Sequence, residues 1–385
     1  MGKRPLISAR HAPGATARQP DVLIIGGGVI GCSVAYYLTR DSALRVVVLE
    51  RGTLGCGASN AAAGVLAVGS SRAPRGVLFE LRRRSAAMFP DLVAALRDQT
   101  AIDPQYVPRG LLELAFTQRE ESELRQLVER RCAQGFRAEL LDAVAARRIE
   151  PYVAPQIRVA ALFHDDHTIN NEKLTAAFAD AASRHGTEFR LGTAAAGVER
   201  AHQRIHRVHT SDGEWLSPGV VVLAAGPWSP EFAALLRVRV PVRPARGEML
   251  AMQPQPGVPQ RTVAWGDGYL VPRPNGELLV GSTTAYADAA TVTSAGIATL
   301  RERAIRMMPA LAAAEIVRTW AGLRPCSTIR RPIIGPVRGF DNFLLATGHH
   351  RNGILLAPIT GQLIAELITE RATSVPLEPF GYRPR

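Results

Sequence analysis

The chain has 385 residues, of which 46% are hydrophobic, and its formal net charge is +12. No apolar run approaches the roughly 18 residues that a membrane-spanning helix needs, so we expect no membrane span. The basic charge is almost entirely arginine, because Lys3 and Lys173 are the only lysines, and the arginines are spread along the chain. Diffuse charge of this kind does not form the basic stripe typical of nucleic-acid binding, so we expect no nucleic-acid partner.

Residues 1–20 are basic, contain no acidic residue and lack the apolar segment of a secretory signal. We predict a disordered tail, with a transit peptide as the alternative. The cysteines form no C-x-x-C pair, which argues against a zinc or dithiol site. Free thiols are typical of a reducing compartment, so the expected location is the cytoplasm.

The predicted secondary structure changes along the chain, from alternating strands and helices to a region of short strands. Strands and helices alternate first, over residues 21–25, 29–40, 44–49, 81–98, 111–116, 120–134, 141–150, 172–184 and 220–225, where 21–25, 44–49, 111–116 and 220–225 are the strands. Residues 238–280 contain many prolines, glycines and short β-like runs, which indicates antiparallel sheet. A helix over 295–308 and a terminal helix ending near residue 370 follow. The polar stretch HDDHTINN, residues 164–171, is predicted to cap the helix after it rather than to bind a metal.

The first strand and helix flank the motif GGGVIG, with glycines at Gly26, Gly28 and Gly31. In a β-α-β unit this spacing gives a tight turn, a close approach for phosphates and close packing of helix on strand. The helix start supplies free N–H groups for a pyrophosphate. Glu50 ends the second strand and can accept hydrogen bonds from a ribose diol, which argues against a 2′-phosphate.

Two further segments favour FAD over NAD. The run GCGASNAAAGVLA, residues 55–67, is made of small residues against which a flat ring could lie. Near the C-terminus, residues 347–367 form a second glycine-rich turn that leads into a helix, and the helix start would favour electron density on a reduced flavin. We therefore expect one long cofactor bound at both ends.

Together with LAAGPWS, GYLVPRPNGELLVGST and WAGLRP, these motifs make the chain similar to the D-amino-acid oxidase superfamily of FAD-dependent oxidoreductases. Within it, the chain most resembles the glycine oxidases of thiamine biosynthesis, over about residues 20–372. The resemblance implies an α/β fold, with an FAD-binding Rossmann-like domain of the glutathione-reductase type and a substrate domain built on an antiparallel sheet. It places 21–85, 168–237 and 322–385 in the first domain, and 86–167 and 238–321 in the second.

The resemblance also implies which residues bind non-covalent FAD and substrate. The cofactor residues would be Gly26, Gly28, Val29, Ile30, Gly31, Glu50, Arg51, Ser59, Ala63, Gly64, Val65, Val198, Gly226, Gly348, His349, His350, Arg351, Asn352, Gly353, Ile354 and Leu355. Arg324 would bind the substrate carboxylate, helped by Tyr269, with Arg351 and Thr284 beside them. An arginine suits this role because its planar fork binds a carboxylate at two points. No side chain is assigned as a catalytic base, because the flavin takes the hydride.

Some positions depart from the family pattern. Arg330 and Arg331 stand where an acid and a glycine are common, and His350 stands where Phe or Tyr is frequent. Related sarcosine oxidases attach their flavin to a cysteine, but the matching position lies near Gly322, four residues from Cys326, so we expect a non-covalent flavin. Those enzymes also use a lysine near the flavin for oxygen chemistry. This chain has no lysine after residue 173, so that lysine has no counterpart here.

The expected activity is oxidative deamination of glycine, sarcosine or small D-amino acids by dioxygen, giving the 2-oxo acid, ammonia or an amine, and hydrogen peroxide. The alternatives are a dehydrogenase that passes electrons to a quinone or partner protein, and a flavin enzyme that acts on amines of modified tRNA bases. The resemblance further implies a homo-oligomer, often a tetramer.

Overall fold

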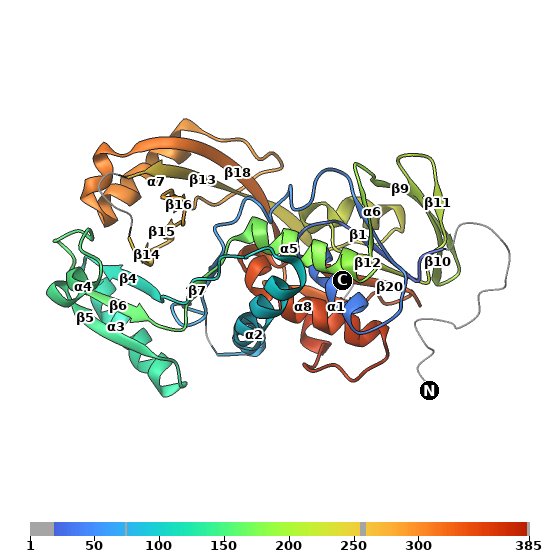
Figure 1. The fold of residues 1–385 in the computed structure, drawn as a ribbon, viewed down its shortest axis with the longest axis horizontal. Helices are drawn as coiled ribbons and strands as arrows, with labels where there is room; N and C mark the ends of the chain where they lie inside the picture. Colours follow the sequence, from blue (N-terminus) through green and yellow to red (C-terminus); the bar gives the residue numbers. More distant parts are fainter. Residues whose placement is uncertain (1–18, 74, 255–258, 383–385) are drawn as a thin grey trace.

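The structure is a computed structural model that describes residues 19–73, 75–254 and 259–382. Most of the predicted tail, residues 1–18, lies outside this part of the chain. Two lobes lie side by side along the long axis of the molecule, and a pair of long strands runs from one lobe to the other (Figure 1).

The first lobe is built on a mostly parallel sheet. Its strand order is β19-β20-β12-β1-β2-β8, and only β19 runs antiparallel to its neighbour. The strands are β1 (Val22–Ile25), β2 (Val46–Glu50), β8 (Glu188–Leu191), β12 (Val220–Leu223), β19 (Ile333–Pro336) and β20 (Phe343–Thr347). The four central strands, β1, β2, β12 and β20, are short, fully buried and almost entirely apolar, as expected where both faces of a parallel sheet are covered.

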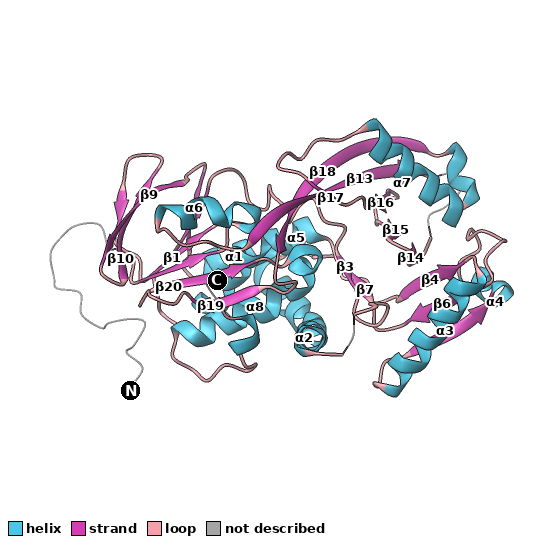
Figure 2. Ribbon diagram, turned by 180° about the vertical axis from the view of Figure 1, so that it is seen from behind, coloured by secondary structure: helices cyan, strands magenta, loops and turns pink. Residues whose placement is uncertain are grey.

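Alternate side chains of these strands enter two different cores. Val22 and Ile24 face the helices α1 (Val29–Arg40), α2 (Val77–Thr100), α5 (Asn171–Arg184) and α8 (Gly353–Ile368). Leu23 and Ile25 face a small sheet and a helix on the other side (Figure 2), namely β9 (Ala195–Ala201), β10 (Arg204–Thr210), β11 (Trp215–Leu216) and α6 (Ser229–Leu235). The period of two along each strand therefore produces the three-layered lobe.

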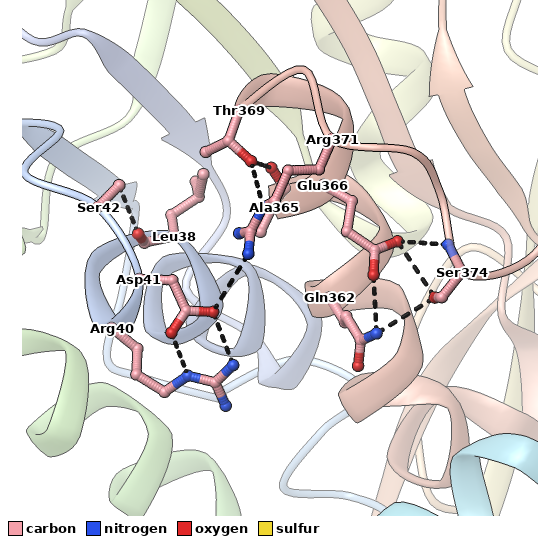
Figure 3. Close-up of polar contacts among 10 residues, drawn as sticks. All are labelled: Leu38, Arg40, Asp41, Ser42, Gln362, Ala365, Glu366, Thr369, Arg371 and Ser374. Carbon is pink, nitrogen blue, oxygen red and sulfur yellow. Dashed lines mark hydrogen bonds and ion pairs between the residues drawn. The ribbon is translucent and has the colours of Figure 1, made fainter.

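Helices α1 and α8 pack closely enough that only a glycine fits at their crossing. A Cβ added at Gly361 would lie 2.7 Å from the carbonyl oxygen of Ser33, and the Ser33 hydroxyl donates to the Ala357 carbonyl at 2.8 Å. At the C-terminal ends of the two helices, Arg371 forms an ion pair with Asp41 at 3.8 Å (Figure 3). These contacts hold the two helices, and therefore their N-terminal ends, in a fixed relation.

The second lobe is built on a larger, mostly antiparallel sheet. Its order is β17-β13-β16-β15-β14-β4-β6-β5, with β18 paired to β13. The strands are β4 (Leu111–Ala115), β5 (Ala138–Asp142), β6 (Val159–Phe163), β13 (Val242–Gln253), β14 (Thr262–Trp265), β15 (Gly268–Pro272), β16 (Leu278–Gly281), β17 (Ala285–Tyr286) and β18 (Glu315–Ser327). Helices α3 (Gln118–Ala133), α4 (Ala143–Ile149) and α7 (Ser294–Met307) accompany it, and β3 (Val65–Leu66) pairs with β7 (His167–Thr168) between the lobes.

The predicted α/β class and the antiparallel sheet after residue 238 are confirmed. The helix predicted over 141–150 is wrong at its start, because residues 138–142 pair with β6 as β5. The helix begins only at Ala143, where the Asp142 carboxylate accepts from the Ala145 N–H at 2.7 Å and caps it.

Three predicted domain boundaries fall inside continuous elements. The boundary between residues 85 and 86 would divide α2, that between 167 and 168 would divide β7, and that between 321 and 322 would divide β18. The domain bounds stay a prediction. Among the described residues, no helix combines the length and apolar character of a membrane span.

Candidate active site

A cavity of about 410 Å³ lies where the carboxyl ends of β1, β2 and β12 meet the long strands of the second lobe. Its walls come from both lobes: the turns after those three strands, residues 55–65, the start of α8, one residue each of β13 and β15, and three residues of β18. Ligands of open α/β sheets bind at this edge.

The turn after β1 brings the sheet and α1 into backbone contact. Gly26 has φ +113°, and a Cβ added at Gly31 would lie only 1.9 Å from the Gly26 carbonyl oxygen. The start of α1 faces the cavity, and the Ser59 hydroxyl accepts from the Val29 N–H at 2.9 Å. Free N–H groups and the helix dipole at this point suit a negatively charged group.

A carboxylate and an aromatic ring mark one end of the cavity. Glu50 is buried, and its two oxygens accept from the N–H groups of Gly27 at 2.8 Å and Gly52 at 2.9 Å. Beside it, the Arg51 guanidinium lies 4.0 Å from the centre of the Trp228 ring. The indole and guanidinium provide a flat surface next to an acceptor for hydroxyl groups, an arrangement that suits a nucleoside.

A guanidinium without an acidic partner lies at the other end. Arg324, on β18, donates to the carbonyl oxygen of Thr283 at 3.1 Å and packs over Gly247, where any side chain would overlap it. Burial lowers the pKa of Arg324, the nearby Tyr269 opposes this shift, and the group stays charged. Within the described part of the chain no ion pair involves Arg324, so its charge is available to a ligand.

A second guanidinium, that of Arg351, lies near Arg324, and both are close to the hydroxyl group of Thr284. Arg351 donates to the Thr284 hydroxyl at 2.7 Å, and Arg324 lies 3.5 Å from that oxygen. Arg351 also pairs with the exposed Asp267 at 3.1 Å. These contacts join the loop before α8 to two loops of the second lobe at the mouth of the cavity.

Two histidines of the same loop are held neutral. His349 is fully enclosed, bonds through Nε2 to the Thr360 hydroxyl at 3.0 Å, and burial lowers its pKa to about 3. Burial, with the charges of Arg351 and Arg324, lowers the pKa of His350 to about 4. Neither imidazole therefore adds positive charge to the cavity at pH 7.

Acid should destabilise the protein through His349. The unfolded histidine binds a proton below about pH 6.5 and the folded one does not, so stability is complete above that pH and falls as the pH drops. Between pH 7 and pH 5 the loss from this one group should be about 2 kcal/mol. Urea unfolding of the FAD-saturated protein at both pH values measures it, and His349→Gln should remove that share of the pH dependence. An unchanged pH dependence in the variant would contradict the assignment.

The comparisons with known proteins agree with this geometry. Residues 21–367 match the family described as DAO, FAD dependent oxidoreductase. The chain belongs to this family.

The chain is 33% identical over 363 residues to the glycine oxidase of Geobacillus kaustophilus, covering 94% of this chain and 96% of that protein. It is 32% identical to the hydrogen cyanide synthase subunit HcnC of Pseudomonas aeruginosa, covering 94% and 95% of the two chains. The crystal structure of the Geobacillus glycine oxidase superposes with a TM-score of 0.91 at 31% identity, covering 96% of this chain and all of the other. The resemblance predicted from the motifs and the dependence on FAD are thereby confirmed.

The residues of this FAD-dependent oxidoreductase fit its cofactor. Small residues line the cavity along 55–65, and a Cβ added at Gly57 would lie 2.9 Å from the Trp228 ring. Both α1 and α8 begin at the cavity, so two helix starts would face a dinucleotide bound between them. We infer that Glu50 and Trp228 hold the adenosine end and that the flavin lies toward Tyr269 and Arg324.

Most of the predicted cofactor residues lie in the cavity wall. Those that line it are Gly26, Gly28, Val29, Ile30, Glu50, Arg51, Ser59, Ala63, Gly64, Val65, Gly226, His349, His350, Arg351, Gly353 and Ile354, and of the predicted substrate residues Arg324, Tyr269 and Arg351 do so. Gly31, Gly348, Asn352 and Leu355 are not among the lining residues, and Thr284 contacts the lining residues Arg324 and Arg351.

Val198 is placed elsewhere. It pairs with Val208 in the small sheet and packs into the core on that side, while Thr193, Ala194 and Ala195 of the same segment line the cavity. Trp228 also lines the cavity but was not predicted as a cofactor residue, although it belongs to the quoted motif LAAGPWS. Gly247 carried no local signal, since only the pairing of β13 with β18 brings it to the wall. Ser282 and Gly322 also line the wall; they lie in the quoted motifs GYLVPRPNGELLVGST and WAGLRP but were not predicted as cofactor or substrate residues.

Proposed function

We propose that this oxidoreductase deaminates glycine, or another small primary or secondary amino acid such as sarcosine or a D-amino acid. The products would be the 2-oxo acid, ammonia or an amine, and hydrogen peroxide. The observation that carries the proposal is the half-buried Arg324, which forms no ion pair among the described residues and lies beside Tyr269 at the proposed flavin end of the cavity. A protein that only bound FAD would not need a guanidinium without an acidic partner at this point.

Each side chain at this end has a chemical task. The Arg324 fork holds the substrate carboxylate and fixes the Cα relative to the ring, with the Tyr269 hydroxyl as a second donor. The positive charges of Arg324 and Arg351 disfavour the ammonium form of the substrate and so promote loss of its proton. FAD, when bound, supplies the hydride acceptor. The neutral histidines add no charge that would compete for the carboxylate.

The electron acceptor distinguishes this proposal from a second candidate. The chain has no lysine beyond Lys173, so the lysine that related sarcosine oxidases use with dioxygen has no counterpart. One relative is itself a subunit of a larger enzyme, hydrogen cyanide synthase. A dehydrogenase that passes electrons to a quinone or partner protein is therefore the second candidate.

A peroxide-coupled screen of the purified, FAD-saturated protein tests both functions. Glycine, sarcosine, D-alanine and D-proline should each be tried, and the proposal expects peroxide from at least one. If a substrate bleaches the flavin anaerobically but the reduced protein is inert to air, the dehydrogenase is supported instead. If none of the amines bleaches the flavin, the substrate class is wrong. Light scattering of the same sample measures the predicted homo-oligomer.

Asp267 offers a test of substrate size and charge. It is exposed and occupies Arg351 in a pair that solvent weakens. Replacing Asp267 by asparagine should free this guanidinium for a second carboxylate. We expect the ratio of kcat/KM for D-aspartate to that for glycine to rise about tenfold, the value of one charge-assisted hydrogen bond. Asp288→Asn, at an exposed acid that forms no ion pair among the described residues, is the matched control. Equal ratios in the two variants would contradict the role given to Arg351.

A further inference from the structure

Arg273 is a half-buried cation at the junction of the two lobes. It follows β15, and its guanidinium donates to the carbonyl of Ile169 at 3.1 Å, to the carbonyl of Ala63 at 3.2 Å and to Asn171 Oδ1 at 3.0 Å. Burial lowers the pKa of Arg273 to about 10, which leaves it charged at pH 7. Among the described residues it forms no ion pair, so its direct partners are carbonyl and amide oxygens, while the charges of Glu172 and Glu277 favour the charged guanidinium without direct contact.

The contact with Ala63 has a consequence for the cavity. In a trans peptide the N–H points away from the C=O, so the Gly64 N–H is directed away from Arg273. Gly64 lines the cavity, and within the described residues its N–H meets no acceptor. The position also requires glycine, since its φ is +71° and a Cβ would lie 1.8 Å from the Ile169 carbonyl oxygen. One peptide therefore has a cation behind it and a free donor in front.

Asn171 extends the contact to the other end of the cofactor site. Its side-chain amide donates to the Ser59 carbonyl at 2.8 Å while its oxygen accepts from Arg273. The Ser59 hydroxyl in turn accepts from the Val29 N–H at the start of α1. The Arg273 guanidinium of the second lobe thus supports the turn at Ala63 and Gly64 directly. Through Asn171 it also supports Ser59, which lies beside the start of α1.

We propose that Arg273 is a positioning residue for the flavin, which holds the Gly64 turn against the ring and places a positive charge behind the peptide that faces it. A positive charge at this position stabilises the reduced, electron-rich ring and raises its midpoint potential. The proposal needs bound FAD but not the amino-acid substrate, so it can fail while the proposed function holds, and the reverse.

The test measures the bound flavin and not turnover. Arg273→Met removes the charge and all three hydrogen bonds, and Arg273→Lys keeps the charge without the fork. Trp320→Phe is the matched control, because its indole N–H donates to Ala61 in the same loop at 3.2 Å but carries no charge. For each holoenzyme, the midpoint potential is measured against reference dyes, and FAD release on dilution is followed by flavin fluorescence.

Arg273→Met should have a more negative midpoint potential and release FAD about tenfold more readily. Arg273→Lys should release FAD more readily but keep a potential close to that of the parent. Trp320→Phe should leave the potential unchanged. A Met variant with the parental potential would overturn the proposal. If Arg273→Met retains no flavin, the test depends on Arg273→Lys, which keeps the charge. A midpoint potential of Arg273→Lys clearly more negative than that of the parent would then overturn the proposal.

Discussion

Replacing Arg324 by methionine should raise KM for the amino-acid substrate by about 100-fold to 1,000-fold and leave FAD bound. The guanidinium forms no ion pair among the described residues, and its charge is aimed into the cavity beside Tyr269. Two charge-assisted hydrogen bonds to a carboxylate contribute about 3–6 kcal/mol, most of which the variant would lose. Steady-state kinetics together with the visible spectrum of the flavin measure both parts of the expectation.

Two further variants sharpen the interpretation. Arg324→Lys keeps a charge without the planar fork and should recover only part of the loss. Arg318→Met, on the same strand but exposed and stacked on Trp320, should behave like the parent protein. If Arg324→Met kept its parental kinetics, Arg324 would have no role in substrate binding, and the proposed substrate class would lose its main support.

Those parts of the site that depend on local sequence were predictable. The spacing of Gly26, Gly28 and Gly31 requires a tight turn whatever surrounds it, and the structure shows why: Gly31 touches the Gly26 carbonyl. Glu50 ends a strand that must lie next to the first in a β-α-β unit, so its place beside the turn also follows from the sequence. The same reasoning applies to the start of α8, because a glycine-rich turn precedes a long apolar helix.

Contacts made by tertiary pairing could not be predicted. Arg273 belongs to a quoted motif, but nothing local indicates that it reaches Ala63 and Asn171, which lie more than a hundred residues away. The pair of Arg351 and Asp267 is of the same kind. At residue 141 the sequence pattern favoured a helix, but residues 138–142 form a strand because they pair with β6. Long-range pairing therefore decides how the site is supported, while local motifs decide where it begins.

The structure also suggests why the cofactor and substrate sites are linked. Strands β13 and β18 pair over their whole length and carry both Arg324 and the glycines Gly247 and Gly322 that form the wall. Gly322 lies so close to residues 55–65 that a Cβ there would be 2.3 Å from the Cβ of Ala61. A shift of this strand pair would therefore move Arg324, the proposed substrate residue, together with the cavity wall formed by Gly247 and Gly322.

Gly31→Ala should abolish FAD binding. The added methyl group would lie 1.9 Å from the Gly26 carbonyl oxygen, and neither backbone can move without separating α1 from β1. Overpacking of this kind typically costs about 1–3 kcal/mol. The larger effect should be on the cofactor, because the start of α1 faces the cavity and its first N–H groups would hold the pyrophosphate. The flavin content of the purified variant and its thermal midpoint with added FAD measure the two consequences.

Gly76→Ala is the matched control, since its φ of 170° is extended backbone and an added Cβ meets nothing within 4 Å. It should bind FAD and unfold like the parent protein. For Gly31→Ala, the flavin content must be compared with the circular dichroism of the same sample, because a misfolded protein would also lack flavin. A variant that folds with its usual circular dichroism but elutes colourless places the effect at the helix start. A yellow variant with parental affinity would mean that the α1 turn does not hold the pyrophosphate, and the assignment of the Glu50 end to adenosine would fail with it.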